Sequence, residues 1–176
     1  MKKSILIILL FIVSVYSFSQ SDAIVKQLGS GITVRFPNNP TYQEKDKAGV
    51  YITATENNMF TVIVKYDVLP YYSEFLKLSE KDQEKGIDVF LDNAIKGILK
   101  ASGNENSPHN KIQVGNHKGR ETSYAAINPI TGEIAMHYVK MLYCYNKLYL
   151  FQCMQLEDNS TSVSERKIFL NSISTK

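Results

Sequence analysis

The hydrophobic pattern of this chain changes period near residue 79, and the two periods limit the folds that it can adopt. Before that point, Phe60, Val62, Val64 and Tyr66 place apolar side chains at every second position, which is typical of a strand with one buried face. After it, apolar residues recur at helical spacing, at Ile87, Phe90, Leu91, Ala94, Ile95, Ile98 and Ala101. The two patterns together predict an α+β fold, in which a long amphipathic helix packs on a sheet.

Three period-two runs precede the helix, at residues 32–36, 50–54 and 60–66. Pro37–Pro40 ends the first run, and Glu56–Asn58 is typical of a hairpin turn between the second and the third. The charged segment Glu44–Lys47 predicts a loop or an edge strand. Because short turns favour antiparallel pairing of neighbouring strands, we expect the three runs to form a meander.

Ser79 and Gly103 mark the ends of the predicted helix. Ser79 with Asp82 three residues later is typical of an N-cap with an acidic first turn, and Gly103 is a natural C-terminal stop. The polar residues fall opposite the apolar stripe, and we expect them to face water. These residues are Glu84, Lys85, Asp88, Asp92, Asn93 and Lys96.

The segment after the helix predicts a pair of strands. Residues 111–114 and 120–127 indicate strands on either side of a Gly115–Gly119 loop. The sequence Asn128–Gly132, which contains a proline and a glycine, then predicts a turn.

The last third of the chain predicts a hairpin and a second helix. The runs Ile134–Cys144 and Lys147–Leu156 are apolar at odd and even positions, which indicates strands covered on both faces. A final helix begins near residues 160–162 and buries Val163, Phe169, Leu170 and Ile173. We therefore expect a mainly antiparallel twisted sheet flanked by helices on opposite faces, which is an α/β/α sandwich.

Cys144 and Cys153 are the two cysteines of the chain, and the predicted hairpin keeps them apart. If residues 146–147 form the turn, Cys153 lies opposite Lys140; if residues 145–146 form it, Cys153 lies opposite Tyr138. In either register the sulfurs are about 14–20 Å apart along the ladder, whereas a disulfide needs Cα atoms within about 7 Å. We expect no disulfide and two free, mostly buried thiols.

Residues 1–19 have the three-part layout of a secretory signal peptide. Two lysines follow the first methionine, an apolar run extends from Ile5 to Val13 within a segment that reaches Phe18, and small serines stand at positions 17 and 19. The segment from Ile5 to Phe18 spans 14 positions, which is shorter than the roughly 20 residues of a transmembrane helix. We expect cleavage between Ser19 and Gln20 and a periplasmic or extracellular protein without a stable membrane span, with an uncleaved anchor as the alternative.

Residues 20–176 have the length of one domain. A chain of this size buries enough surface to fold without a metal or a disulfide. Two of the 20 basic residues lie in the leader, which leaves 18 basic against 17 acidic residues. This near-neutral balance gives no electrostatic argument for nucleic-acid binding, which usually depends on a clustered basic face.

Several segments together resemble the PsbP-like sandwich family. They are Gly31–Pro40, the central long helix, Gly115 with Gly119-Arg120-Glu121, Asn146–Tyr149 in the hairpin and Phe169–Ser172 in the last helix. The resemblance covers nearly all of residues 20–176. It implies an α/β/α sandwich and a role among exported or organelle-lumen binding and assembly proteins, without catalytic residues to transfer.

The residue types that carry catalysis or bind metals do not form a recognisable pattern. His109, His117 and His137 lack metal-site spacing with one another and with the cysteines. The chain contains no Gly-x-Ser-x-Gly elbow, and cysteines in apolar strands are not expected to be reactive. We therefore expect no metal, no cofactor and no catalytic residue.

Two segments carry side chains suited to ligand binding. In the first, backbone amides between Gly115 and Gly119 can cup an anion, with His117, Lys118 and Arg120 as polar partners. The alternative is a β-turn whose charges face water.

The second segment is the tyrosine pair Tyr71 and Tyr72, which lies in an exposed connection before the long helix. Exposed tyrosine offers apolar area and a hydroxyl together, which makes it a favoured recognition residue. The alternative is a pair of strand-rim tyrosines without a binding role.

These observations favour an exported, non-enzymatic binding or assembly module. Its partner is an envelope or extracellular protein or a small ligand of unknown identity. The alternative is a small exported hydrolase or transferase with a site near the Gly115–Glu121 loop. A closed pocket that brings His117, Arg120 and a carboxylate together favours the enzyme, whereas a shallow aromatic surface favours the binding module.

Overall fold

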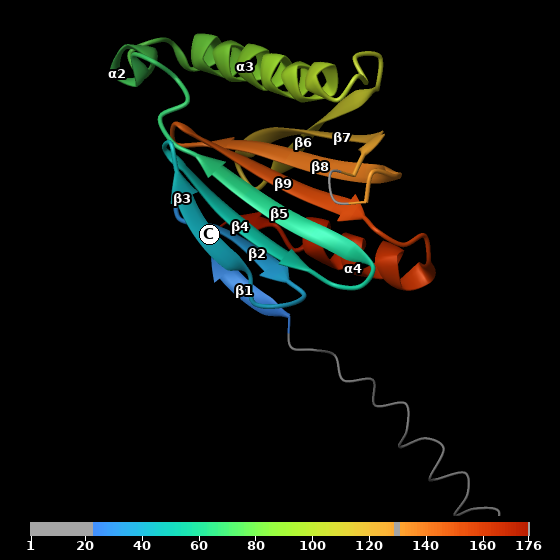
Figure 1. Cartoon of the computed structure of the whole chain (residues 1–176). Coiled ribbons are helices and arrows are strands. Elements are labelled where there is room, and N and C mark those ends of the chain that lie inside the picture. Colours follow the sequence, from blue (N-terminus) through green and yellow to red (C-terminus); the bar gives the residue numbers. More distant parts are fainter. Residues whose placement is uncertain (1–22, 129–130, 176) are drawn as a thin grey trace, which may run out of the picture.

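A computed structural model describes residues 23–128 and 131–175, which form two antiparallel sheets and three helices (Figure 1). The predicted leader, residues 1–19, lies outside the described residues. The larger sheet has the order β3-β4-β5-β9-β8-β7-β6. Its strands are β3 (Thr41–Lys45), β4 (Ala48–Ala54), β5 (Asn58–Lys65), β6 (His109–Val114), β7 (His117–Ile127), β8 (Ile134–Cys144) and β9 (Lys147–Gln155).

The smaller sheet lies under one face of the larger one, together with a helix (Figure 1). Its order is β1-β2-β10, with β1 (Ile24–Gln27), β2 (Ile32–Phe36) and β10 (Ser174–Thr175). The helices are α2 (Tyr72–Phe75), α3 (Glu80–Ala101) and α4 (Ser160–Asn171). Since α3 lies on one face of the larger sheet and α4 on the other, the predicted sandwich with helices on opposite faces is confirmed.

The ends of the two longer helices follow from local hydrogen bonds. The Ser79 hydroxyl accepts a hydrogen bond from the Asp82 amide at 3.2 Å, as predicted for the N-cap of α3. Gly103 follows the helix with φ +72°, which a glycine adopts without strain. Helix α4 begins at Ser160, where the final helix was predicted to begin, and the Asn159 side chain accepts a hydrogen bond from the Ser162 amide at 2.8 Å.

Two cores flank the larger sheet. On the α4 side, Phe169 packs against Phe36 and Phe60, with ring centroids 5.4 and 5.0 Å apart. On the α3 side, Leu91, Ile95 and Leu99 are buried against residues of β7 and β8. No helix among the described residues is both long and apolar enough to cross a membrane.

The predicted meander of three strands is wrong for its first member. Strands β4 and β5 pair as expected, but β2 pairs with β1 and β10 in the smaller sheet. The apolar residues Ile32, Val34 and Phe36 are fully buried, as the period-two pattern predicts. Period two identifies the buried face of a strand without identifying its neighbours, so the pattern left the pairing open.

The hairpin β8–β9 adopts the second of the two registers considered. Tyr145 and Asn146 form the turn with φ angles of 46° and 58°, and Cys153 lies opposite Tyr138. Cys144 pairs with Lys147, so the two cysteines are far apart along the ladder. Both are free and buried.

Candidate functional site

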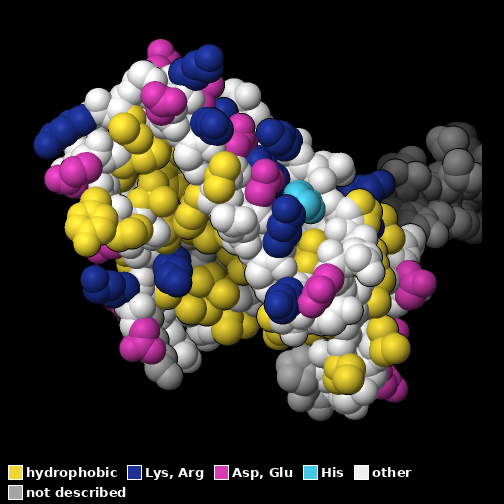
Figure 2. Space-filling model, turned by 90° about the horizontal axis from the view of Figure 1, so that it is seen from above, with side chains coloured by type: hydrophobic (Ala, Val, Ile, Leu, Met, Phe, Trp, Pro, Cys, Tyr) yellow, Lys and Arg dark blue, Asp and Glu magenta, His cyan; other side chains and the backbone are white. Residues whose placement is uncertain are grey.

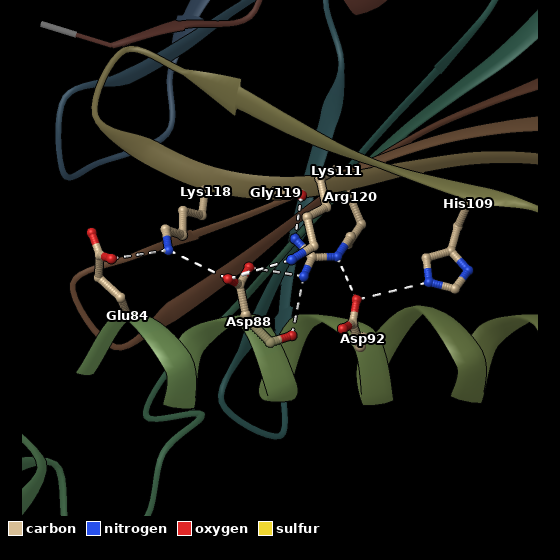
Figure 3. Close-up of polar contacts among 8 residues, drawn as sticks. All are labelled: Glu84, Asp88, Asp92, His109, Lys111, Lys118, Gly119 and Arg120. Carbon is tan, nitrogen blue, oxygen red and sulfur yellow. Dashed lines mark hydrogen bonds and ion pairs between the residues drawn. The ribbon is translucent and has the colours of Figure 1, made fainter. Parts of the chain in front are cut away.

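A charged cluster joins α3 to β7 (Figure 3). Arg120 is 1% exposed, and its Nε donates to Asp92 Oδ1 at 2.6 Å while its Nη2 donates to Asp88 Oδ1 at 2.9 Å. Nη1 donates to the Gly119 carbonyl at 2.8 Å. The prediction that Asp88 and Asp92 face water is therefore wrong, because the two carboxylates point at the sheet and are only about a third exposed.

Weaker ion pairs surround this centre. Lys118 Nζ lies 3.4 Å from Asp88 Oδ2, and Lys111 Nζ lies 3.6 Å from the same atom. The hydrogen bonds from Arg120 hold the pKa values of Asp88 and Asp92 below their ordinary value. Burial opposes the charge on Arg120, but the bonds to both carboxylates outweigh burial and raise its pKa. The cluster is thus a charged clamp between helix and sheet.

The clamp predicts a loss of stability in acid. A carboxylate whose pKa is lower in the folded state stabilises the fold above its unfolded pKa of about 3.9. That contribution disappears as the pH falls through the folded pKa. In urea titrations between pH 5 and pH 3, we expect Asp92→Asn to make the free energy of unfolding fall less steeply than in the unmodified protein. Glu105→Gln, at an exposed position, is the control and should leave the slope unchanged; equal slopes for both variants would contradict the prediction.

His117 lies on the other face of β7. Its Nε2 is 3.4 Å from the Cys144 Sγ, and its ring meets Tyr145 edge-on at 5.6 Å. Burial lowers the pKa of His117 and raises the pKa of Cys144 to about 11, against a smaller opposing effect of Lys147. Cys144 is therefore a protonated thiol at neutral pH, which is the opposite of an activated nucleophile.

The structure does not bring the residues of the predicted Gly115–Glu121 site together. The predicted loop is too long, because β7 already begins at His117 and only Gly115 and Asn116 form the turn. Residues alternate across a strand, so His117 faces the α4 side while Lys118 and Arg120 face α3. The convergence of His117, Arg120 and a carboxylate that favours an enzyme is absent from the described residues.

His137 is the most deeply buried of the three histidines. His137 stacks on Tyr124 at 5.2 Å, and its Nδ1 lies 2.6 Å from Gln152 Nε2. Burial lowers its pKa, and its Nε2 has no hydrogen-bond partner among the described residues. Within the part of the chain that the structure describes, no three His, Cys, Asp or Glu side chains are grouped to hold a metal.

The predicted tyrosine pair lies at one end of the larger sheet. Tyr71 is 80% exposed with φ +59°, whereas Tyr72 is half-buried and stacks on Phe75 at 6.1 Å. The connection that carries them is tied to the β8–β9 turn, since the Leu69 amide donates to Asn146 Oδ1 at 2.8 Å. Tyr145 in that turn is 66% exposed, so a second prominent tyrosine, which sequence reasoning missed, stands at this end.

A further surface, separate from the clamp, is the half of the larger sheet that α3 leaves uncovered. A helix about 10 Å across covers about two strands at a spacing of roughly 4.8 Å, and α3 lies over β7 and β8. On β5, the residues facing α4 are fully buried, while Met59, Thr61 and Ile63 on the α3 side are partly exposed. Figure 2, a view onto the α3 side, shows hydrophobic side chains gathered in a hollow. We call this surface the hollow and define its floor as Val50, Ile52, Met59, Ile63, Leu148 and Leu150.

One flank of α3 borders the hollow. Phe90 meets Tyr143 of β8 edge-on at 5.8 Å, so its side of the helix is turned toward β9 and β5. Gly97 lies on the same flank, one helical turn beyond Ala94, and a Cβ added there would have no neighbour within 4 Å. Gly97 is exposed, so this part of the flank is open to solvent.

The comparisons with known proteins concern the fold. No family model and no curated protein matches the chain. Cyanobacterial PsbP (CyanoP) from Synechocystis sp. PCC 6803 superposes with a TM-score of 0.54 at 12% identity, over 91% of this chain and 96% of that one.

Two further solved structures match less well. A protein from Bacteroides thetaiotaomicron VPI-5482 has a TM-score of 0.47 at 10% identity, over 89% of this chain, which spans about half, 49%, of that protein. PA94 from Pseudomonas aeruginosa, of unknown function and described as a putative regulator, has a TM-score of 0.36 at 10% identity, over 82% of this chain and 88% of that one. The superposition on CyanoP confirms the resemblance drawn from the sequence: this chain has a PsbP-like α+β sandwich fold.

Proposed function

We propose that this chain is an exported, non-catalytic binding module that takes up an apolar ligand in the hollow. The observation that carries the proposal is the partly exposed apolar floor, which includes one face of β5, a strand whose opposite face is fully buried. Contiguous apolar surface of this kind is uncommon on monomeric proteins unless it binds something. A concave surface lined by apolar side chains with a few polar groups is the usual form of a small-molecule site.

Two observations support the non-catalytic part of the proposal. The thiol of Cys144 has a pKa of about 11 and that of Cys153 about 12, in both cases through burial, so neither is a nucleophile at neutral pH. The guanidinium of Arg120 already donates hydrogen bonds to Asp88 and Asp92, and His117 lies on the opposite face of the same strand.

The proposal of export rests on the signal-like residues 1–19.

The PsbP-like fold is compatible with this proposal without identifying the ligand. CyanoP shares the sandwich at 12% identity, which supports the architecture alone. The three ligand-binding residues predicted near Gly115 and the pair Tyr71 and Tyr72 stay predictions. Of these, the tyrosines lie in the connection that leads from β5, a floor strand of the hollow, to α3.

A polarity-sensitive dye tests the proposed site. We expect the folded protein to enhance the fluorescence of anilinonaphthalene sulfonate saturably, and Ile63→Thr to weaken that binding several-fold because it makes the centre of the floor polar. Ile52→Thr, at a position 39% exposed, should act in the same direction.

Ile127→Thr is the matched control, since Ile127 is a strand isoleucine that is 69% exposed and lies outside the hollow. All three variants should unfold at similar urea concentrations. The proposal fails if the folded protein does not bind the dye saturably, or if Ile127→Thr weakens binding as much as Ile63→Thr.

A further inference from the structure

We infer that the hollow binds a long-chain fatty acid, with Lys65 holding the carboxylate. This inference rests on the proposed function and specifies its ligand. It starts from the distribution of charge around the hollow. All six floor residues are uncharged, and Phe90, Ala94 and Gly97 on the adjoining helix flank are uncharged as well.

Lys65 stands at one end of this uncharged surface. It is the last residue of β5 and lies on the same side as Ile63, because residues two apart on a strand face the same way. In the sheet it lies between Ala48 of β4 and Leu148 of β9. Its side chain is exposed and forms no ion pair with any residue that the structure describes. A cation at one end of an apolar surface is complementary to an apolar chain with one anionic end.

The length of the floor matches an acyl chain. Lys65 and Met59 are six residues apart on β5, which corresponds to about 20 Å. The hydrocarbon core of a bilayer is about 30 Å thick, so an acyl chain in one leaflet spans about 15 Å. A single long chain therefore fits between Lys65 and the far end of the floor.

The chemistry of the floor favours an acyl chain over an extended peptide. A peptide carries an N–H and a C=O at every residue, and each needs a hydrogen-bond partner when it is buried. The floor presents side chains rather than strand edges, and its six members have no hydrogen-bonding side-chain groups apart from the thioether of Met59. Thr61 and Gln152, which pair on the same side of β5 and β9, are the polar side chains among them, and two such groups are too few to satisfy the backbone of an extended peptide. An acyl chain needs no such partners.

A second copy of this chain is also a poor occupant. A symmetric dimer brings the same patch of both subunits together. Two hollows placed face to face leave a gap rather than a close-packed contact, whereas stable interfaces bury about 800 Å² per partner with good shape complementarity.

Palmitate binding to the purified protein, measured by calorimetric titration below the concentration at which palmitate forms micelles, tests the inference. We expect one site per chain and at least tenfold weaker binding by Lys65→Glu, because that variant places a negative charge beside the carboxylate. Hexadecanol, which has the same chain without the charge, should bind both proteins equally. Lys167→Glu on the exposed side of α4 is the charge-matched control and should bind palmitate like the unmodified protein.

The outcomes separate this inference from the proposed function. If palmitate does not bind, or binds Lys65→Glu as well as the unmodified protein, the fatty-acid assignment is wrong even when the dye still binds in the hollow. If light scattering shows a dimer that Ile63→Thr dissociates, the hollow is an interface between copies and the assignment is also wrong. If Ile63→Thr binds the dye as tightly as the unmodified protein does, the proposed function itself fails. Circular dichroism and urea midpoints identify any variant that has lost its fold.

Discussion

Replacing Asp88 and Asp92 together by asparagine is expected to lower the free energy of unfolding by about 3 kcal/mol, the lower end of the range for breaking a buried ion pair. The reason is the burial of Arg120, which is 1% exposed and would keep its charge without an anion beside it. Neutral amides still accept hydrogen bonds but do not compensate the charge. Urea denaturation at neutral pH measures the loss.

The triple variant Arg120→Met, Asp88→Asn and Asp92→Asn provides the internal control. It removes the buried charge as well as its partners, and replacing all members of a buried ionic cluster is often close to neutral. We expect the triple variant to recover most of the stability that the double variant loses. A double variant within about 0.5 kcal/mol of the unmodified protein, or a triple variant less stable than the double, would contradict the role of the clamp.

The elements that could be predicted from the sequence are those determined by neighbouring residues. The stripe from Ile87 to Ala101, the Ser79 cap and the Gly103 stop are local features, and the structure confirms each of them in α3. The same holds for the turn before β5 and for the start of α4. The pairing of β2 with β10 could not be predicted, because β10 comes from the other end of the chain.

The charged clamp was missed although its signal is present in the sequence. Asp88, Asp92, Ile95 and Leu99 follow one another at spacings of four, three and four, which places them on one side of a helix. The two aspartates therefore border the buried stripe and do not lie opposite it. Because they are acidic, the two side chains were expected to be exposed to water, whereas in the fold they pair with a buried arginine.

The hollow exists because one helix covers only part of the width of the larger sheet. No local sequence pattern shows how much of a sheet a helix will cover. Ile63 lies between Val62 and Val64, so β5 is apolar on both faces and looks like a strand buried on both sides. Seven strands at roughly 4.8 Å span about 30 Å, which a single helix about 10 Å across does not cover. The sequence predicts apolar residues on both faces, but only the assembled layers show which of them stay uncovered.

Gly119→Ala is expected to destabilise the protein by about 3 kcal/mol or more, at or above the upper end of the usual range for overpacking. A Cβ at this position would lie 2.2 Å from the Met141 carbonyl oxygen and 2.6 Å from Leu142 Cδ2. The first contact is with the backbone of the neighbouring strand β8, so a side-chain rotation cannot relieve it. Gly119 is thus required for the close packing of β7 against β8. This explains the presence of a glycine at a position that the sequence analysis assigns to a ligand-binding loop.

Gly97→Ala makes the same chemical change in open space and should have the opposite effect. Because a Cβ at Gly97 has no neighbour within 4 Å and the residue lies inside α3, alanine should stabilise the helix by about 0.5–1 kcal/mol. Urea denaturation of the two variants side by side therefore separates steric exclusion from a general effect of adding a methyl group. If Gly119→Ala unfolds at the same urea concentration as the unmodified protein, β7 and β8 are not packed as closely as the structure has them, and the placement of Arg120 beneath α3 loses its support.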